Sequence, residues 1–313
     1  MRKQDSKTRN KIKLFIRIKK YVLKKITLFL IKFGKRFISN DSKYLKLIFR
    51  LRMGKKLNLN NPTTFNEKLQ WLKLYDQNDF YTSLVDKYEV KKYVSNLIGK
   101  EYIIPTLGIY NNFDEIDFSK LPNEFVIKCT HDSGGIVICK DKKNFDLNKA
   151  RKKINKRLNN NFYYNFREWV YKNVKPRIIV EKYMGSNSKE ELVDYKFLTF
   201  NGRVEIMYIA SNRNGKGDTY FDFFDRNFNY IELKNGHANN PIRPKKPVGF
   251  NKMIQLAEKL SKNCHHVRID FYETNGKIYF GEMTFYHMSG TVPFEPEEWD
   301  YKLGNLITLP DKQ

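Results

Sequence analysis

Two carboxylates late in the chain, Asp270 and Glu282, have the side chains and surroundings of a cation site. Each stands in an apolar segment, where burying a lone charge is costly and a shared cation offsets that cost. Two hard oxygen ligands on rigid strands suit Mg²⁺, which keeps several waters and takes its remaining ligands from phosphates. The pair therefore predicts a bound nucleoside triphosphate. A second interpretation fits equally well: one acid forms an ion pair with Arg268 and the other faces solvent, because ion-pair networks resemble such sites.

A β-hairpin is the element that would position these two carboxylates. Residues 267–273 and 277–284 alternate apolar with polar or aromatic side chains, and the turn sequence Asn275-Gly276 lies between them. A two-residue turn would send the two acids to opposite faces of the hairpin. We predict instead a three-residue turn with Gly276 in the left-handed conformation. That turn places four side chains on one face: Arg268, Asp270, Phe280 and Glu282.

A lysine and a glycine loop in the middle of the chain form a second candidate site. Residues 125–129 and 136–140 are strand-like, and Thr130-His131-Asp132-Ser133-Gly134-Gly135 joins them. Lys128 closes the first strand, so its ammonium and the N–H groups of the loop could meet a polyphosphate. Ordinary turn chemistry, with Lys128 emerging at a strand end, explains the same residues. These residues alone leave both interpretations open.

The composition is that of a globular protein with an unusually large positive charge. Of the 313 residues, 41% are hydrophobic and 15% aromatic, and the formal net charge is +25. Nucleic acid, an anionic membrane surface or an anionic substrate would each suit this charge, and the codon usage of an AT-rich genome would explain part of it. The three widely spaced cysteines indicate neither a disulfide framework nor a zinc site, so we expect a cytoplasmic protein.

Much of the positive charge lies in a predicted basic amphipathic helix over residues 11–33. Residues 1–40 contain fourteen Lys and Arg and one acid, so they contribute +13. Apolar residues recur every three or four positions, and the longest uncharged run is too short to span a bilayer. The helix could lie on the inner face of the membrane, dock on its own domain or contact RNA. We favour the membrane, because anionic lipid attracts basic side chains.

Periodicity predicts the remaining elements. Thr64 and Glu67 have capping-box spacing, which marks the start of a helix. The other predicted elements are helices from residue 86, across 144–174 and across 251–264, and strands across 177–184, 195–200, 204–210 and 219–233.

Several candidate features follow one another in a fixed order: Lys87, Lys128, Ser133-Gly134-Gly135, Glu181-Lys182-Tyr183-Met184, Asp270 and Glu282. This ordered set resembles the ATP-grasp superfamily. Within it, the chain is similar to the TupA-like branch of teichuronopeptide biosynthesis, over about residues 60–310. The motifs shared with that branch are Phe65-Asn66-Glu67-Lys68-Leu69-Gln70-Trp71, Asp86-Lys87-Tyr88, Phe125-Val126-Ile127-Lys128-Cys129, Arg167-Glu168-Trp169, Asp194-Tyr195-Lys196-Phe197, Arg268-Ile269-Asp270 and Gly281-Glu282-Met283-Thr284.

The resemblance implies an α+β, ATP-grasp fold in which two α+β lobes clasp ATP, preceded by a helical N-terminal region. We predict four parts, the first of which lies outside the resemblance: residues 1–40, a basic amphipathic helical extension; 41–115, the helical N-terminal region; 116–176, lobe A with the glycine loop; and 177–313, lobe B with the hinge and the metal site.

The same resemblance implies the nucleotide contacts. Lys87 and Lys128 would neutralise phosphate oxygens, and the backbone of Ser133, Gly134 and Gly135 would close over the triphosphate. The main chain of Lys182 and Met184 would read the adenine edge, with Glu181 in hydrogen-bond reach. Lys196 is also assigned to nucleotide binding.

Metal binding and catalysis are implied at the late hairpin. Asp270 and Glu282 would hold Mg²⁺ against the phosphates. Thr284 stands where many ATP-grasp enzymes have Asn, and its hydroxyl could still bind the metal or its water. Arg268 would bind an acyl phosphate and act in catalysis with Lys128; a structural role for Arg268 beside Asp270 is equally consistent.

The implied function is an ATP- and Mg²⁺-dependent ligase that activates a carboxylate as an acyl phosphate for attack by an amine or a similar nucleophile. Its substrates would be an acidic glycan or lipid-linked saccharide and an amino compound, in cell-surface or capsular polysaccharide biosynthesis. A glycosyltransferase of that pathway is the alternative, although the chain contains no Asp-x-Asp. A nucleic-acid-binding protein is disfavoured, because about half of the charge lies in one terminal helix.

Overall fold

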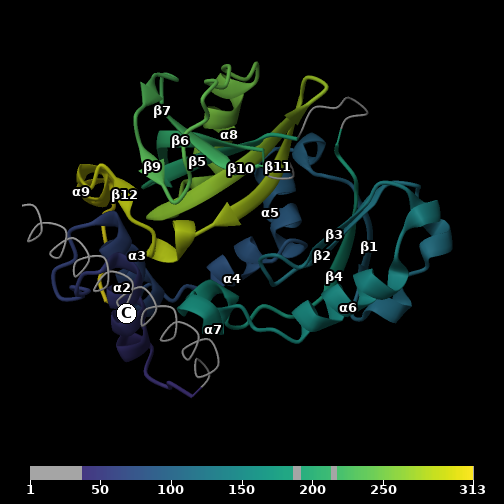
Figure 1. Cartoon of the computed structure of the whole chain (residues 1–313), viewed down its shortest axis with the longest axis horizontal. Helices are drawn as coiled ribbons and strands as arrows, with labels where there is room; N and C mark the ends of the chain where they lie inside the picture. Colours follow the sequence, from purple (N-terminus) through teal and green to yellow (C-terminus); the bar gives the residue numbers. More distant parts are fainter. Residues whose placement is uncertain (1–36, 186–191, 213–216, 313) are drawn as a thin grey trace, which may run out of the picture. The chain divides into compact units, whose positions relative to one another are not determined.

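The computed structural model describes residues 37–185, 192–212 and 217–312, which belong to two compact units, 1–57 and 58–313 (Figure 1). In the first unit, the helix α2 (Asp41–Met53) lies within residues 41–115, which were predicted to be helical without bounds for this helix. The side chain of Asn40 caps its start, and Gly54 ends it in the left-handed conformation. The predicted basic helix over residues 11–33 lies outside the described residues. None of the helices that are described has the length and apolar character needed to cross a membrane.

The second unit contains a four-stranded antiparallel sheet with the order β1-β4-β2-β3. Its strands are β1 (Thr106–Tyr110), β4 (Ile178–Lys182), β2 (Phe125–Cys129) and β3 (Ile136–Cys139). The sheet thus includes β1, which was not predicted as a strand, and β4, which begins after the predicted end of lobe A.

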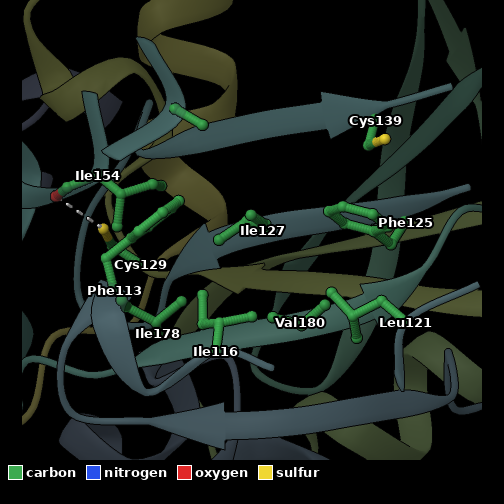
Figure 2. Close-up of a cluster of buried hydrophobic side chains, with 11 residues drawn as sticks. Phe113, Ile116, Leu121, Phe125, Ile127, Cys129, Cys139, Ile154, Ile178 and Val180 are labelled. Carbon is green, nitrogen blue, oxygen red and sulfur yellow. Dashed lines mark hydrogen bonds between the residues drawn. The ribbon is translucent and has the colours of Figure 1, made fainter. Parts of the chain in front are cut away.

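One face of this sheet packs on the helix α6 (Leu147–Leu158) through a buried apolar cluster (Figure 2). Phe125, Ile127 and Cys129 alternate along β2 into this cluster, and Ile154 of α6 packs against them. The Cys129 thiol donates a weak hydrogen bond to the carbonyl oxygen of Ile154, 3.8 Å away. Because neighbouring strand residues alternate, Lys128 is left on the opposite face of the sheet.

The second sheet has six antiparallel strands in the order β11-β10-β5-β6-β7-β8. They are β11 (Lys277–Thr284), β10 (His266–Thr274), β5 (Asp194–Phe200), β6 (Arg203–Ser211), β7 (Tyr220–Asp225) and β8 (Tyr230–Ile231). The predicted Asn201-Gly202 turn joins β5 to β6, with both residues at positive φ. The helix α8 (Phe250–Ser261) packs on the sheet and buries Phe250, Met253 and Ala257.

The other described helices of this unit are α3 (Phe65–Tyr75), α4 (Asp79–Val85), α5 (Glu89–Ile98), α7 (Tyr163–Phe166) and α9 (Glu298–Leu306). Single turns of 3-10 helix include η1 (Lys100–Tyr102), η5 (Trp169–Tyr171) and η6 (His287–Gly290). A short ladder pairs β9 (Lys234–Asn235) with β12 (Phe294–Glu295). The capping box predicted at Thr64 and Glu67 starts α3. The predicted α+β class is confirmed.

Candidate functional site

A pocket in the second unit is lined by residues from both sheets. Lys128 and Glu181 reach it from the four-stranded sheet, and Lys196 and Glu282 reach it from the six-stranded one. Lys87, just before α5, also lines it. The fold therefore brings five of the residues singled out in the sequence to one place.

Glu181 lies between two lysines inside this pocket. Its Oε2 is 2.7 Å from the Nζ of Lys128, and the Nζ of Lys91 contacts its Oε1. Burial would raise the pKa of Glu181, but the two lysine charges outweigh it and hold that pKa below its usual value. The carboxylate thus stays ionised and fixes both ammonium groups.

Lys91 is a pocket residue that the sequence analysis missed. Besides Glu181, its Nζ donates to the carbonyl oxygen of Ile104 at 2.7 Å and to Oγ1 of Thr106 at 2.8 Å. These contacts tie α5 to β1 and β4. Its spacing of four residues from Lys87 is not a helical one, because Lys87 lies before the start of α5, so there was no clear signal for this residue in the sequence.

Lys87 connects the pocket to the glycine loop. Its Nζ donates to the carbonyl oxygen of Asp132 at 2.8 Å. Burial lowers the pKa of Lys87, and the charge of Glu282 opposes that shift. Gly134 has a φ of +98°, a conformation that favours glycine.

Some of the predicted nucleotide contacts lie outside the pocket lining. Among the described residues, those that line the pocket include neither the loop residues Ser133, Gly134 and Gly135 nor the hinge residues Lys182 and Met184. The main-chain N–H of Lys182 donates to the carbonyl oxygen of Pro105 at 3.0 Å. The roles assigned to these five residues stay predictions.

The late hairpin pairs Asp270 directly with Glu282, as its predicted function requires. The predicted three-residue turn is wrong. Thr274 pairs with Lys277, so the turn consists of Asn275-Gly276 alone, with φ values of +51° and +69°.

With this short turn alone, Asp270 would pair with Gly281. A β-bulge at Gly281 shifts the register by one residue, so that Asp270 pairs with Glu282 instead. The register shifts between Asp270 and Phe271, so Phe271 pairs with Phe280 while Asp270 pairs with Glu282. Phe280 consequently lies on the face opposite to the acids, contrary to the prediction. A Cβ on residue 281 would approach the carbonyl oxygen of Asp270 to 3.1 Å, which explains the glycine there.

Both interpretations of the two acids describe part of what is found. Arg268 donates to Asp270 through Nε at 2.7 Å and through Nη2 at 2.8 Å, and the Nζ of Lys196 contacts the same carboxylate. Asp270 is buried, whereas the side chain of Glu282 is 44% exposed and lines the pocket. Burial would raise the pKa of Asp270, but the charges of Arg268 and Lys196 hold it below its usual value.

The donor chemistry at this position fits Mg²⁺. Asp270 and Glu282 supply two hard carboxylates from paired positions, and Thr284 supplies a hydroxyl that is itself 3.4 Å from Oε1 of Glu282. The described residues contain no group of three or more His, Cys, Asp or Glu side chains arranged to hold a metal. A small ligand set suits an ion that takes its other ligands from water and phosphate, and it does not suit a structural zinc site.

Comparison with known proteins gives one family match. The model of the TupA-like ATP-grasp family matches residues 67–308. No curated protein matches the chain.

Similar solved structures include the D-alanine–D-alanine ligase of Bacillus anthracis complexed with ATP. The two sequences are 15% identical, the match covers 72% of this chain and 58% of that chain, and the TM-score is 0.37. The corresponding ligase of Helicobacter pylori has 15% identity, 76% and 62% coverage and a TM-score of 0.36. The ATP-grasp ligase PsnB with a precursor variant, Mg and ADP has 9% identity, 70% and 55% coverage and a TM-score of 0.37. The chain thus covers 58% of the first ligase.

Proposed function

The chain belongs to the TupA-like ATP-grasp family of ATP-dependent ligases, and from this we propose that it activates a carboxylate as an acyl phosphate and couples it to an amine or a similar nucleophile. The observation that supports this most strongly is the placement of Lys87 and Lys128 in one pocket with Glu282, whose strand partner is Asp270. Lys128 from the four-stranded sheet and Glu282 from the six-stranded sheet meet in this pocket, and Lys87 joins them from the segment before α5.

The residues of the pocket divide the proposed work among them. Lys128 and Lys87 neutralise phosphate oxygens, and Glu181 holds Lys128 in place until the nucleotide arrives. Asp270 and Glu282 would hold Mg²⁺, which when bound stabilises negative charge on the phosphates. The apolar side chains of Ile104 and Ile136 offer a surface for the base.

We further propose an acidic glycan or a lipid-linked saccharide as the substrate and an amino compound as its partner, in the assembly of a cell-surface or capsular polysaccharide. The net charge of +25 supports an acidic substrate. The proposal puts the enzyme in the cytoplasm at the inner face of the membrane, with residues 11–33 as the contact with anionic lipid.

Ligand-dependent thermal unfolding tests the proposed nucleotide. A ligand that binds only the folded chain at about 100 times its Kd stabilises it by about 2.7 kcal/mol, so Mg-ATP should raise the Tm by roughly 5 °C or more. ATP with EDTA should raise the Tm less, and nucleotide sugars should leave it unchanged. A rise with a nucleotide sugar and none with Mg-ATP would instead identify a sugar transferase.

A further inference from the structure

The guanidinium of Arg268 contacts all three side chains that are proposed to bind the metal. Its Nη2 lies 2.8 Å from Oδ2 of Asp270, 3.0 Å from Oε1 of Glu282 and 3.0 Å from Oγ1 of Thr284. Arg268 is 7% exposed and its Nε also donates to Asp270, so the group is held in place. One nitrogen atom therefore contacts every side chain in the proposed donor set.

His287 offers this guanidinium a further acceptor, which lies near Nη1. Nδ2 of Asn235 donates to the carbonyl oxygens of Val292 and Pro293, so its Oδ1 faces Nε2 of His287 at 2.9 Å. Nε2 must then carry the proton of the neutral ring. Nδ1 is left as an acceptor, and it lies 3.5 Å from Nη1 of Arg268.

We propose that Arg268 is an internal counter-cation that fills the divalent-metal site until the nucleotide delivers the metal. Metal binding then requires Nη2 to leave Glu282 and Thr284, while Nε stays on Asp270 and Nη1 moves closer to His287. This inference rests on the proposed function, because it takes Asp270, Glu282 and Thr284 as the metal donors. A metal ion between these three side chains cannot share that position with Nη2, since like charges repel strongly at short distance in a partly buried site.

The displacement predicts an order of binding. Without nucleotide, Mg²⁺ must remove a cation that already satisfies two carboxylates, and the free ion gains little in exchange. With ATP present, phosphate oxygens complete the shell of the metal and add negative charge, so the exchange becomes favourable. Arg268 thereby makes metal binding depend on the nucleotide.

Binding of Mn²⁺, which reports on Mg²⁺ sites, tests this inference without any assay of activity. The full-length chain is titrated with Mn²⁺ in the absence of nucleotide, and free Mn²⁺ is measured by electron paramagnetic resonance. Arg268→Met is expected to bind Mn²⁺ at least about tenfold more tightly than the native chain. The matched control is Lys87→Met, which also removes one positive charge that acts on Glu282. It differs from Arg268→Met because the Nζ of Lys87 donates its hydrogen bond to the carbonyl oxygen of Asp132, which is not a proposed metal donor. It should change the affinity by less than about threefold.

Equal affinities of Arg268→Met and the native chain would overturn the inference, and so would equal gains in Arg268→Met and Lys87→Met. Circular dichroism checks that each variant is folded. If Arg268→Met is unfolded, Arg268→Lys replaces it, because the lysine keeps the charge beside Asp270 but cannot reach all three donors. A native affinity in that variant would contradict the inference. Equilibrium dialysis with Mn²⁺ and ATP on both sides of the membrane separates the two proposals: failure of the native chain to retain Mn²⁺ beyond the protein-free side would refute the proposed metal site itself.

Discussion

Replacing Glu282 with Gln is expected to reduce magnesium-dependent ATP turnover by at least about 10²- to 10³-fold. The amide keeps the shape of the side chain but removes the charge that would hold the metal opposite Lys87 and Lys128, to which phosphate binding is assigned by the proposal. Because the side chain is 44% exposed, the free energy of unfolding should change by about 1 kcal/mol or less. Turnover is measured as ADP release with and without Mg²⁺, and unfolding with urea.

The control for this variant is Glu232→Gln, which makes the same chemical change at an exposed position just after β8. It should leave turnover and stability near the native values. Full turnover in Glu282→Gln would remove Glu282 from the metal site and leave Lys87 and Lys128 facing a pocket without the proposed chemistry.

Asp270→Asn is expected to act differently, because it should destabilise the fold as well as stop turnover. The substitution removes the carboxylate that the buried Arg268 and Lys196 share, and breaking a buried ion pair costs about 3–5 kcal/mol. The remaining partners, Glu282 for Arg268 and Asp194 for Lys196, put the expected cost at the lower end of that range. The expected result is a lower urea midpoint at pH 7. Comparing the stability of this variant with that of Glu282→Gln then distinguishes the two acids: Asp270 stabilises the fold, whereas Glu282 faces the pocket.

The pH dependence of stability has a predicted sign for the same residue. Arg268 and Lys196 hold the pKa of Asp270 below its usual value in the folded chain. The stability that this carboxylate contributes is therefore fully present above the unfolded pKa of about 4, and it is lost as the pH falls through the lower folded pKa. Asp270→Asn should lack this part of the acid-induced loss of stability.

Asp222 provides the matched control, since it is a buried aspartate on β7 whose pKa is raised by burial. The Asp222→Asn variant should cost less than about 1 kcal/mol at pH 7, because among the described residues no cation forms an ion pair with that carboxylate. If the free energy of unfolding falls by the same amount in both variants, the ion pairs of Asp270 are not the source of its contribution to stability.

The sequence predicts local elements well where side-chain periodicity and turn chemistry agree. The Asn201-Gly202 hairpin and the Thr64 capping box both form as expected, and the family membership follows from motifs that lie in order along the chain. These features depend on neighbouring residues, so no tertiary contact is needed to detect them.

Two features escaped prediction because tertiary pairing decides them. Lys196 and Asp270, which contact each other, are 74 residues apart in the sequence. Lys91 is identified by its contacts with Glu181, Ile104 and Thr106, which only the folded chain brings to it. The turn at Gly276 was mispredicted because the function required the acids on one face, and the bulge at Gly281 meets that requirement instead. A glycine inside a strand was the signal for that bulge.

The most direct test of the central claim is a crystal structure grown with Mn²⁺ and a non-hydrolysable ATP analogue, with the metal located by its anomalous scattering. We predict a metal peak about 2.0–2.2 Å from oxygens of Asp270 and Glu282, with the triphosphate reaching Lys128 across the pocket. The opposite result is a metal peak remote from both carboxylates, or an analogue bound outside the pocket, and either would contradict the proposed site.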